Sequence, residues 1–307
     1  MFDQKIEEMI EQVQKPARYT GGEMNTAIKS WPEAEVHFAF CFPDTYEVAM
    51  SHLGMKILYG VINQQPWALC ERVCMPWVDM KALMEKEGIP LFSLETRTPL
   101  NRFDVVGFTL QYEMSYSNIL AMLKLGGIPL HTAERTDADP IVCVGGPCAF
   151  NPEPLADFVD AVMIGDGEEM IVEFIAAVRE WKKSGEPREA CLRRLAKIPG
   201  VYVPSFYEVS YHEDGTIAAF TPKCPEAPAT VRKRLVLDMD KAYYPTEIPV
   251  PYTEIVHDRI MLEIMRGCTR GCRFCEAGIL YRPVRERSLE RLMELARALE
   301  KSTGYEE

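Results

Sequence analysis

Residues 141–168 read IVCVGGPCAFNPEPLADFVDAVMIGDGE and contain the pattern that decides the fold. Two short apolar runs, 141–144 and 161–164, each end in a turn rich in glycine. An earlier run, DVVGFTL at 104–110, has the same character. These runs are too uniformly apolar for strands with one face in water, so they predict strands buried on both faces of a parallel sheet.

Helical segments alternate with these strands along the first part of the chain. We expect helices at 2–14, 49–63, 78–87, 115–125 and 170–183, and further strands at 35–40, 71–75 and 91–94. Strands that alternate with helices are typical of an α/β fold, here a doubly wound, Rossmann-like parallel sheet.

The turns that follow the strands predict a ligand cleft, because such sheets bind ligands outside the carboxyl ends of their strands. The candidate cleft residues are Asp44, Gln111, Gly145, Gly146, Gly165 and Glu168. A second interpretation stays open. The glycines could serve only the tight turns, and Asp44, Asp166 and Glu168 could serve only as helix caps.

Length and charge exclude some classes of protein. The chain has 307 residues, 47% of them hydrophobic, and a net charge of −12. An acidic chain of this kind is not a general binder of nucleic acid. Its apolar runs fall far short of a membrane span, and its first residues lack the pattern of a signal peptide. We therefore expect a cytoplasmic protein with no membrane partner, and the sequence does not indicate a nucleic acid partner.

Four segments are expected along the chain. An N-terminal helical segment covers 1–34 and the α/β domain covers 35–190. A proline-rich connector at 191–256 contains a predicted hairpin, with arms at 201–210 and 216–220. A new unit covers 257–307, with a strand at 259–265, a cysteine loop and a helix at 289–301 that Ser288 caps.

The cysteine loop carries the strongest chemical signal. Cys268, Cys272 and Cys275 have the spacing C-x3-C-x2-C. Three thiolates on one loop can each bind one iron of a [4Fe–4S] cluster, which leaves the fourth iron open for a chelating substrate. Gly267 and Gly271 allow the loop to bend tightly.

Charge near the loop supports this interpretation, and zinc is the alternative. Arg266, Arg270 and Arg273 add positive charge that favours thiolates and an anionic cluster. Structural zinc needs a fourth ligand, but the nearest histidine is His257 and no cysteine follows in the sequence. The other cysteines are scattered, which is typical of small buried thiols.

The segment from Glu263 to Gly278 resembles the signature of the radical S-adenosylmethionine (radical SAM) superfamily, including Phe274 before the third cysteine. The resemblance implies that S-adenosylmethionine chelates the open iron and is cleaved to a 5′-deoxyadenosyl radical. It also implies that Phe274 lies near the adenine, with Gly267, Gly271 and Arg270 in the cofactor loop. Residues 259–301 would form the first β/α unit of a partial TIM barrel, and the reductant would be a protein such as flavodoxin or ferredoxin.

The upstream domain resembles the cobalamin-binding domains that precede the barrel in one branch of this superfamily. The resemblance rests on Phe-Pro-Asp44, on the strand at 104–107, and on the turns at 145–147 and 165–168. It implies cobalamin as a further cofactor. The family motif D-x-H-x-x-G is absent, because His52 follows Asp44 at the wrong spacing and falls within a helical pattern. Two alternatives are compatible with the missing motif. Cobalamin could bind without a histidine ligand, or the domain could be a vestigial scaffold.

The chain resembles the N-terminal half of such an enzyme. A partial barrel of six β/α units would need about 150 further residues, which we expect on the same parent chain or on a partner chain. The isolated chain would then be inactive. Two other functions remain open, namely a cobalamin- or nucleotide-binding module without catalysis and an interaction protein held together by zinc.

Overall fold

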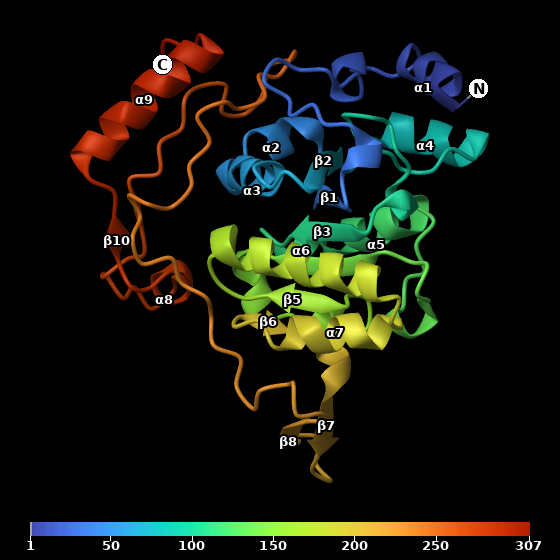
Figure 1. The fold of residues 1–307 in the computed structure, drawn as a ribbon, viewed down its shortest axis with the longest axis vertical. Coiled ribbons are helices and arrows are strands. Elements are labelled where there is room, and N and C mark those ends of the chain that lie inside the picture. The colour runs from blue at the N-terminus through green and yellow to red at the C-terminus, as the bar shows by residue number, and fades with distance from the viewer. Residues whose placement is uncertain (1) are drawn as a thin grey trace.

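A six-stranded sheet forms the centre of the protein, described by a computed structural model of residues 2–307 (Figure 1). The strands lie across the sheet in the order β2 (Ala68–Cys74), β1 (Val36–Phe42), β3 (Val105–Thr109), β4 (Ile141–Gly145), β5 (Ala161–Met163) and β6 (Val201–Tyr202). β1 to β5 are mutually parallel, and β6 runs antiparallel at the edge. The predicted doubly wound α/β sheet is confirmed.

Helices cover the sheet. They are α1 (Phe2–Ile10), α2 (Tyr46–Met50), α3 (Leu53–Asn63), α4 (Val78–Glu87), α5 (Tyr116–Leu125), α6 (Gly167–Ser184) and α7 (Arg188–Ala196). β3 is buried along its whole length, as expected for a strand with a helix layer on each side. On one face, α3 contacts β2, α6 contacts β1, and the two helices contact each other.

The strand order reverses at β1. The chain passes from β1 to β2 on one side and then returns to place β3 on the other side of β1. Helices that begin at the carboxyl ends of two such neighbouring strands diverge, which leaves a crevice. The fold therefore places a ligand cleft at the carboxyl ends of β1 and β3.

Three predicted elements differ from the structure. The helix predicted at 49–63 is two helices, because the imidazole of His52 accepts the backbone N–H of Met55 at 3.1 Å and so begins α3. The helix predicted at 2–14 ends at Ile10. The strand predicted at 91–94 is wrong, because its backbone N–H groups bond to separate parts of the chain and form no ladder.

The connector begins later than predicted. Residues 201–202 form β6 of the main sheet, so the α/β unit continues past residue 190. The predicted hairpin is present as β7 (Tyr207–Tyr211) and β8 (Ile217–Pro222), and it projects from the sheet (Figure 1). Pro204, in a short 3-10 turn, separates β6 from β7.

The C-terminal segment lies beside the α/β unit (Figure 1). It contains β9 (Met265–Arg266), α8 (Ala277–Leu280), β10 (Arg285–Glu286) and α9 (Leu289–Thr303). Ser288 caps α9 as predicted. The strand predicted at 259–265 is wrong: only β9 forms, paired antiparallel with β10, and within residues 2–307 no neighbouring strand offers a ladder to 259–264.

Gly165 is where the connector meets the sheet. The backbone of Arg234 bonds to Ile164 and Asp166 on either side of Gly165, at 2.9 Å each. Gly165 has φ +111°, and a Cβ atom there would lie 2.2 Å from the carbonyl oxygen of Arg234. Its missing side chain thus permits both the turn and the close approach of the connector.

We expect Gly165→Ala to lower the free energy of unfolding by about 3 kcal/mol, because it adds a backbone clash to an unfavourable conformation. Gly185→Ala is the matched control. Gly185 also has positive φ, but no atom lies within 4 Å of the position that an added methyl group would take, so we expect about 1 kcal/mol. Urea unfolding followed by circular dichroism measures both, and equal losses would contradict the role of Arg234.

Candidate functional site

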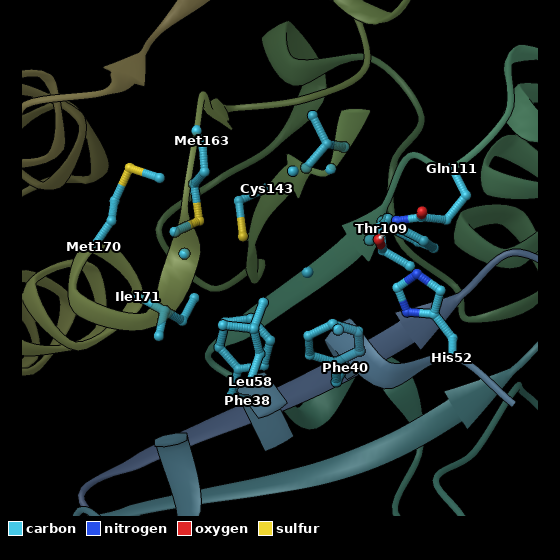
Figure 2. Close-up of a pocket in the computed structure, with 18 residues that line it drawn as sticks. Phe38, Phe40, His52, Leu58, Thr109, Gln111, Cys143, Met163, Met170 and Ile171 are labelled. Carbon is cyan, nitrogen blue, oxygen red and sulfur yellow. Dashed lines mark hydrogen bonds between the residues drawn. The ribbon is translucent and has the colours of Figure 1, made fainter. Parts of the chain in front are cut away.

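An inner cavity of about 150 Å³ lies between the sheet and helices α3 and α6 (Figure 2). Its walls are largely apolar and include Phe38, Phe40, Leu58, Cys143, Met163, Met170 and Ile171. Gly107 of β3 lets the ring of Phe38 pack directly against the strand, since a Cβ atom there would lie 2.4 Å from that ring. A concave apolar cavity with few polar groups is the usual form of a small-molecule site.

Polar groups gather at one end of the inner cavity. The side-chain amide of Gln111 donates to the hydroxyl of Thr109, and the imidazole of His52 lies beside them (Figure 2). Burial lowers the pKa of His52, so its ring is neutral near pH 7. Because Nδ1 accepts the N–H of Met55, the neutral ring carries its proton on Nε2. This end can therefore both donate and accept hydrogen bonds.

An outer cavity of about 250 Å³ adjoins the inner one and shares His52, Leu58 and Gln111 with it. One side consists of α3 and the turns after β4 and β5. The other side consists of Glu263, Arg266 and Tyr281 from the C-terminal segment. The segment that carries the cysteines therefore forms the outer wall of the cleft.

The structure brings together five of the six predicted cleft residues. The inner cavity is lined by Gln111, Gly145, Gly146 and Gly165, and the outer one also by Glu168. Asp44 lines neither cavity: it is exposed, and its carboxylate accepts the N–H of Thr45 at 2.7 Å.

Sequence reasoning missed His52 as a cleft residue. The apolar spacing on both sides of it suggested one continuous helix, which placed His52 in the helix interior. The signal that was available is the short polar pair Ser51-His52 between two apolar runs, which marks a possible helix start. Because His52 caps α3, its ring stands at the cleft.

Ion pairs attach the cysteine segment to the turn after β5. Arg266 pairs with Asp166 at 3.3 Å, with Glu263 at 2.7 Å and with Glu168. We call these four residues the arginine clasp. Its side chains are mostly buried, Arg266 being 12% exposed, and the carboxylates raise the pKa of Arg266. Arg285 adds a second pair with Asp166.

The ion pairs of the clasp change two interpretations made from the sequence, one of Arg266 and one of Asp166. The structure assigns Arg266 to three carboxylates, whereas the sequence suggested that its charge favours the thiolates. Asp166 stands at the N-terminus of α6 but makes no side-chain capping bond. It accepts instead the backbone N–H of Val236 at 2.8 Å and pairs with the arginines. The turn after β5 is thus a docking point for the C-terminal segment.

The cysteine loop follows the clasp directly. Cys268 and Cys275 are half-buried and Cys272 is exposed, and all three thiols are free. Gly267 has φ +93°, and a Cβ atom there would lie 2.6 Å from the carbonyl oxygen of Pro283. Gly271 also has positive φ, so both glycines permit the bends that the sequence predicted.

The three thiols do not converge in this structure. Among the described residues 2–307, no group of three or more His, Cys, Asp or Glu side chains is placed to hold a metal ion. Phe274, between the second and third cysteines, is 93% exposed. Arg270 is also exposed, and its backbone N–H donates weakly to the sulfur of Cys268 at 3.5 Å.

Other cysteines of the chain have a different environment. Cys41, Cys70, Cys143 and Cys191 are buried, and burial raises the pKa of each thiol. The pKa of Cys74 rises to about 12 for the same reason. Neutral buried thiols are packing groups, which agrees with the role predicted for the scattered cysteines.

Comparison with known proteins identifies a family model and a curated relative that each match part of this chain. Residues 54–204 match the family model described as radical SAM proteins, N-terminal. An uncharacterized protein of Methanocaldococcus jannaschii is 29% identical over 210 residues, which are 68% of this chain and 38% of that protein. The predicted resemblance to radical SAM proteins is confirmed.

Two solved structures are similar over 87% of this chain and 32% of theirs, both at 14% identity. They are the cobalamin-dependent S-adenosylmethionine radical enzyme OxsB with aqua-cobalamin and S-adenosylmethionine bound, at TM-score 0.47, and the same enzyme with aqua-cobalamin bound, at TM-score 0.48. The chain thus spans about a third of the length of these proteins. Within residues 2–307, none of the helices is sufficiently long and apolar to span a membrane.

We expect Arg266→Met to release the cysteine segment, because it leaves three largely buried carboxylates without their shared cation. Breaking such pairs costs about 3 kcal/mol, so backbone amides in residues 275–287 should exchange hydrogen about 100-fold faster. Arg270→Met removes an exposed arginine of the same loop and should leave exchange unchanged. Hydrogen-exchange mass spectrometry measures the exchange rates in both variants. Equal rates in the two would show that the clasp does not hold the cysteine segment.

Proposed function

We propose that this chain is the cofactor-binding front part of a radical SAM enzyme, because residues 54–204 match the family model described as radical SAM proteins, N-terminal. In this proposal Cys268, Cys272 and Cys275 hold a [4Fe–4S] cluster, and S-adenosylmethionine chelates its open iron. The observation that carries the proposal is the position of the three-cysteine loop, directly after the clasp that attaches it to the wall of the outer cavity.

The donor set suits an iron–sulfur cluster. All three ligands are sulfur, which iron–sulfur clusters require, and they belong to one short loop with free thiols. The exposed Cys272 and the two positive-φ glycines leave the loop able to draw its thiols together. Three thiols leave one iron without a protein ligand, which is the position that a chelating amino acid group needs.

Each part of this chain would have a separate task in the reaction. A cluster held by Cys268, Cys272 and Cys275 would supply the single electron needed for reductive cleavage of S-adenosylmethionine. The clasp orients the loop toward the cleft, and Phe274 offers an exposed aromatic face for the adenine. The proposal further requires the remaining barrel strands, on the parent chain or a partner, and a reductant such as flavodoxin or ferredoxin.

We also propose that the cleft of the α/β unit binds cobalamin. Support comes from the apolar inner cavity at the point where the strand order reverses, and from its polar end at His52, Thr109 and Gln111. A cavity of about 150 Å³ accommodates one ring system, so the bulk of such a ligand would occupy the outer cavity and the space beyond it. A nucleotide bound in the same cleft is the alternative.

We expect about four irons and four sulfides per chain after anaerobic reconstitution, together with the absorption of a [4Fe–4S] cluster. Substitution of all three loop cysteines by alanine should abolish both, because no ligands remain. Cys224→Ala, which removes a half-buried thiol elsewhere, should retain the cluster. Iron and sulfide quantitation with absorption spectroscopy measures this.

A chain that takes up zinc and no iron would contradict the cluster and favour the zinc alternative. The full-length protein provides the second step of the test. There, Cys272→Ala should abolish reductive cleavage of S-adenosylmethionine, and normal cleavage by that variant would end the radical SAM proposal.

We expect aquacobalamin to bind with a change in its visible spectrum, and Leu58→Trp to weaken binding by about tenfold or more. Leu58 lines both cavities, so a larger ring there would occupy the ligand's space. Leu83→Trp, a half-buried leucine of α4 outside both cavities, is the matched control. No spectral change at high excess of aquacobalamin would contradict this part of the proposal, and a nucleotide titration would then test the alternative.

A further inference from the structure

A third cavity lies on the other side of α3. It has a volume of about 670 Å³ and is bounded by α3 and by the connector at 241–247. The residues of α3 that line it are Lys56, Tyr59, Gly60 and Asn63, which follow helical spacing and form one face. The inner and outer cavities use the opposite face, with Gly54, Ile57 and Leu58. We call the third space the Lys56 cavity.

Lys56 is an exception among the buried cations of residues 2–307. Six lysine or arginine residues are buried there, and each of the five arginines pairs with a carboxylate. The pairs are Arg72 with Glu23 and Glu95, Arg135 and Arg188 with Asp160, Arg285 with Asp166, and Arg287 with Glu263. Lys56 is only 6% exposed, yet within the same residues its ammonium makes neither an ion pair nor a hydrogen bond.

The surroundings of Lys56 do not compensate its charge. Asp258 attracts the ammonium and Arg72 repels it, but neither is in contact with it. Burial is the dominant influence and lowers the pKa of Lys56 to about 8, so the amine is still mostly charged at pH 7. The ammonium nitrogen itself is not fully buried, so an anion that enters the cavity can reach a cation that has lost much of its hydration and has no ion pair.

The rest of the Lys56 cavity is largely polar. Lys241 and Arg291 line it, each paired with a neighbouring carboxylate, Asp238 and Glu294, and Glu247 adds one more carboxylate. The hydroxyl of Tyr243 lies over the backbone of Gly60, where a Cβ atom would come within 2.2 Å of it. The missing side chain of Gly60 therefore lets the connector close over α3 while the space beside Lys56 stays open.

We propose that the Lys56 cavity binds a small anionic molecule, whose phosphate or carboxylate group pairs with the ammonium of Lys56. This site is separate from the cleft and the cysteine loop, because it lies on the opposite face of α3 and shares no lining residue with them. The volume exceeds that of a single phosphate, so the ligand carries further atoms that lie along Tyr59 and Tyr243.

Inorganic phosphate and malonate are the probes, measured by isothermal titration calorimetry on the full chain. We expect saturable binding of at least one of them, and Lys56→Met should weaken it by about tenfold or more. Lys86→Met removes an exposed lysine outside the cavity, so binding should change little. Phosphate binding alone identifies a phosphorylated ligand, and malonate binding alone identifies a carboxylate.

A second measurement needs no variant. Reductive methylation followed by peptide mass spectrometry reports the reactivity of each lysine, and the bound anion should slow modification of Lys56 but not of the exposed Lys86. Lys56→Met should also unfold at a urea concentration no lower than that of the unsubstituted chain, since it removes a largely desolvated cation that has no ion pair. The proposal would be overturned if neither anion bound saturably or if Lys56→Met bound the anion with unchanged affinity. It would also be overturned if the bound anion did not slow modification of Lys56.

Discussion

The arginine clasp is the interaction on which the arrangement of the candidate site depends. Asp166, Glu168 and Glu263 are largely shielded from water, and Arg266 is the cation that all three share. Charges in such an environment cannot separate without a large loss of free energy. The turn after β5 and the cysteine segment are therefore held together, although they are about a hundred residues apart in the chain.

Because of this attachment, the segment that carries the cysteines supplies one wall of the cleft. The inner cavity opens toward His52 and Gln111, the outer cavity continues from there, and its far wall belongs to the segment that carries the cysteines. Helix α3 has a second function in this arrangement, since its opposite face supplies Lys56 to a separate cavity.

Much of the α/β unit could be predicted, because a buried parallel strand leaves a local signal in the sequence. The runs at 104–110 and 141–144 are apolar on both faces, and their positions agree with β3 and β4. The strands predicted at 91–94 and 259–265 are also apolar in part, yet they do not form. A strand needs a neighbour with free backbone groups, and local sequence says nothing about whether one is present.

By itself the sequence determined the sheet, the glycine-dependent turns and the three-cysteine loop, since each depends on residues close together in the chain. Only the tertiary structure decided that His52 begins a helix at the cleft and that Arg266 serves carboxylates and not thiolates. It also decided that Lys56 is buried without a partner. These cases share one physical reason. Whether a charged side chain has a partner depends on segments that lie far apart in the sequence and that only folding brings together.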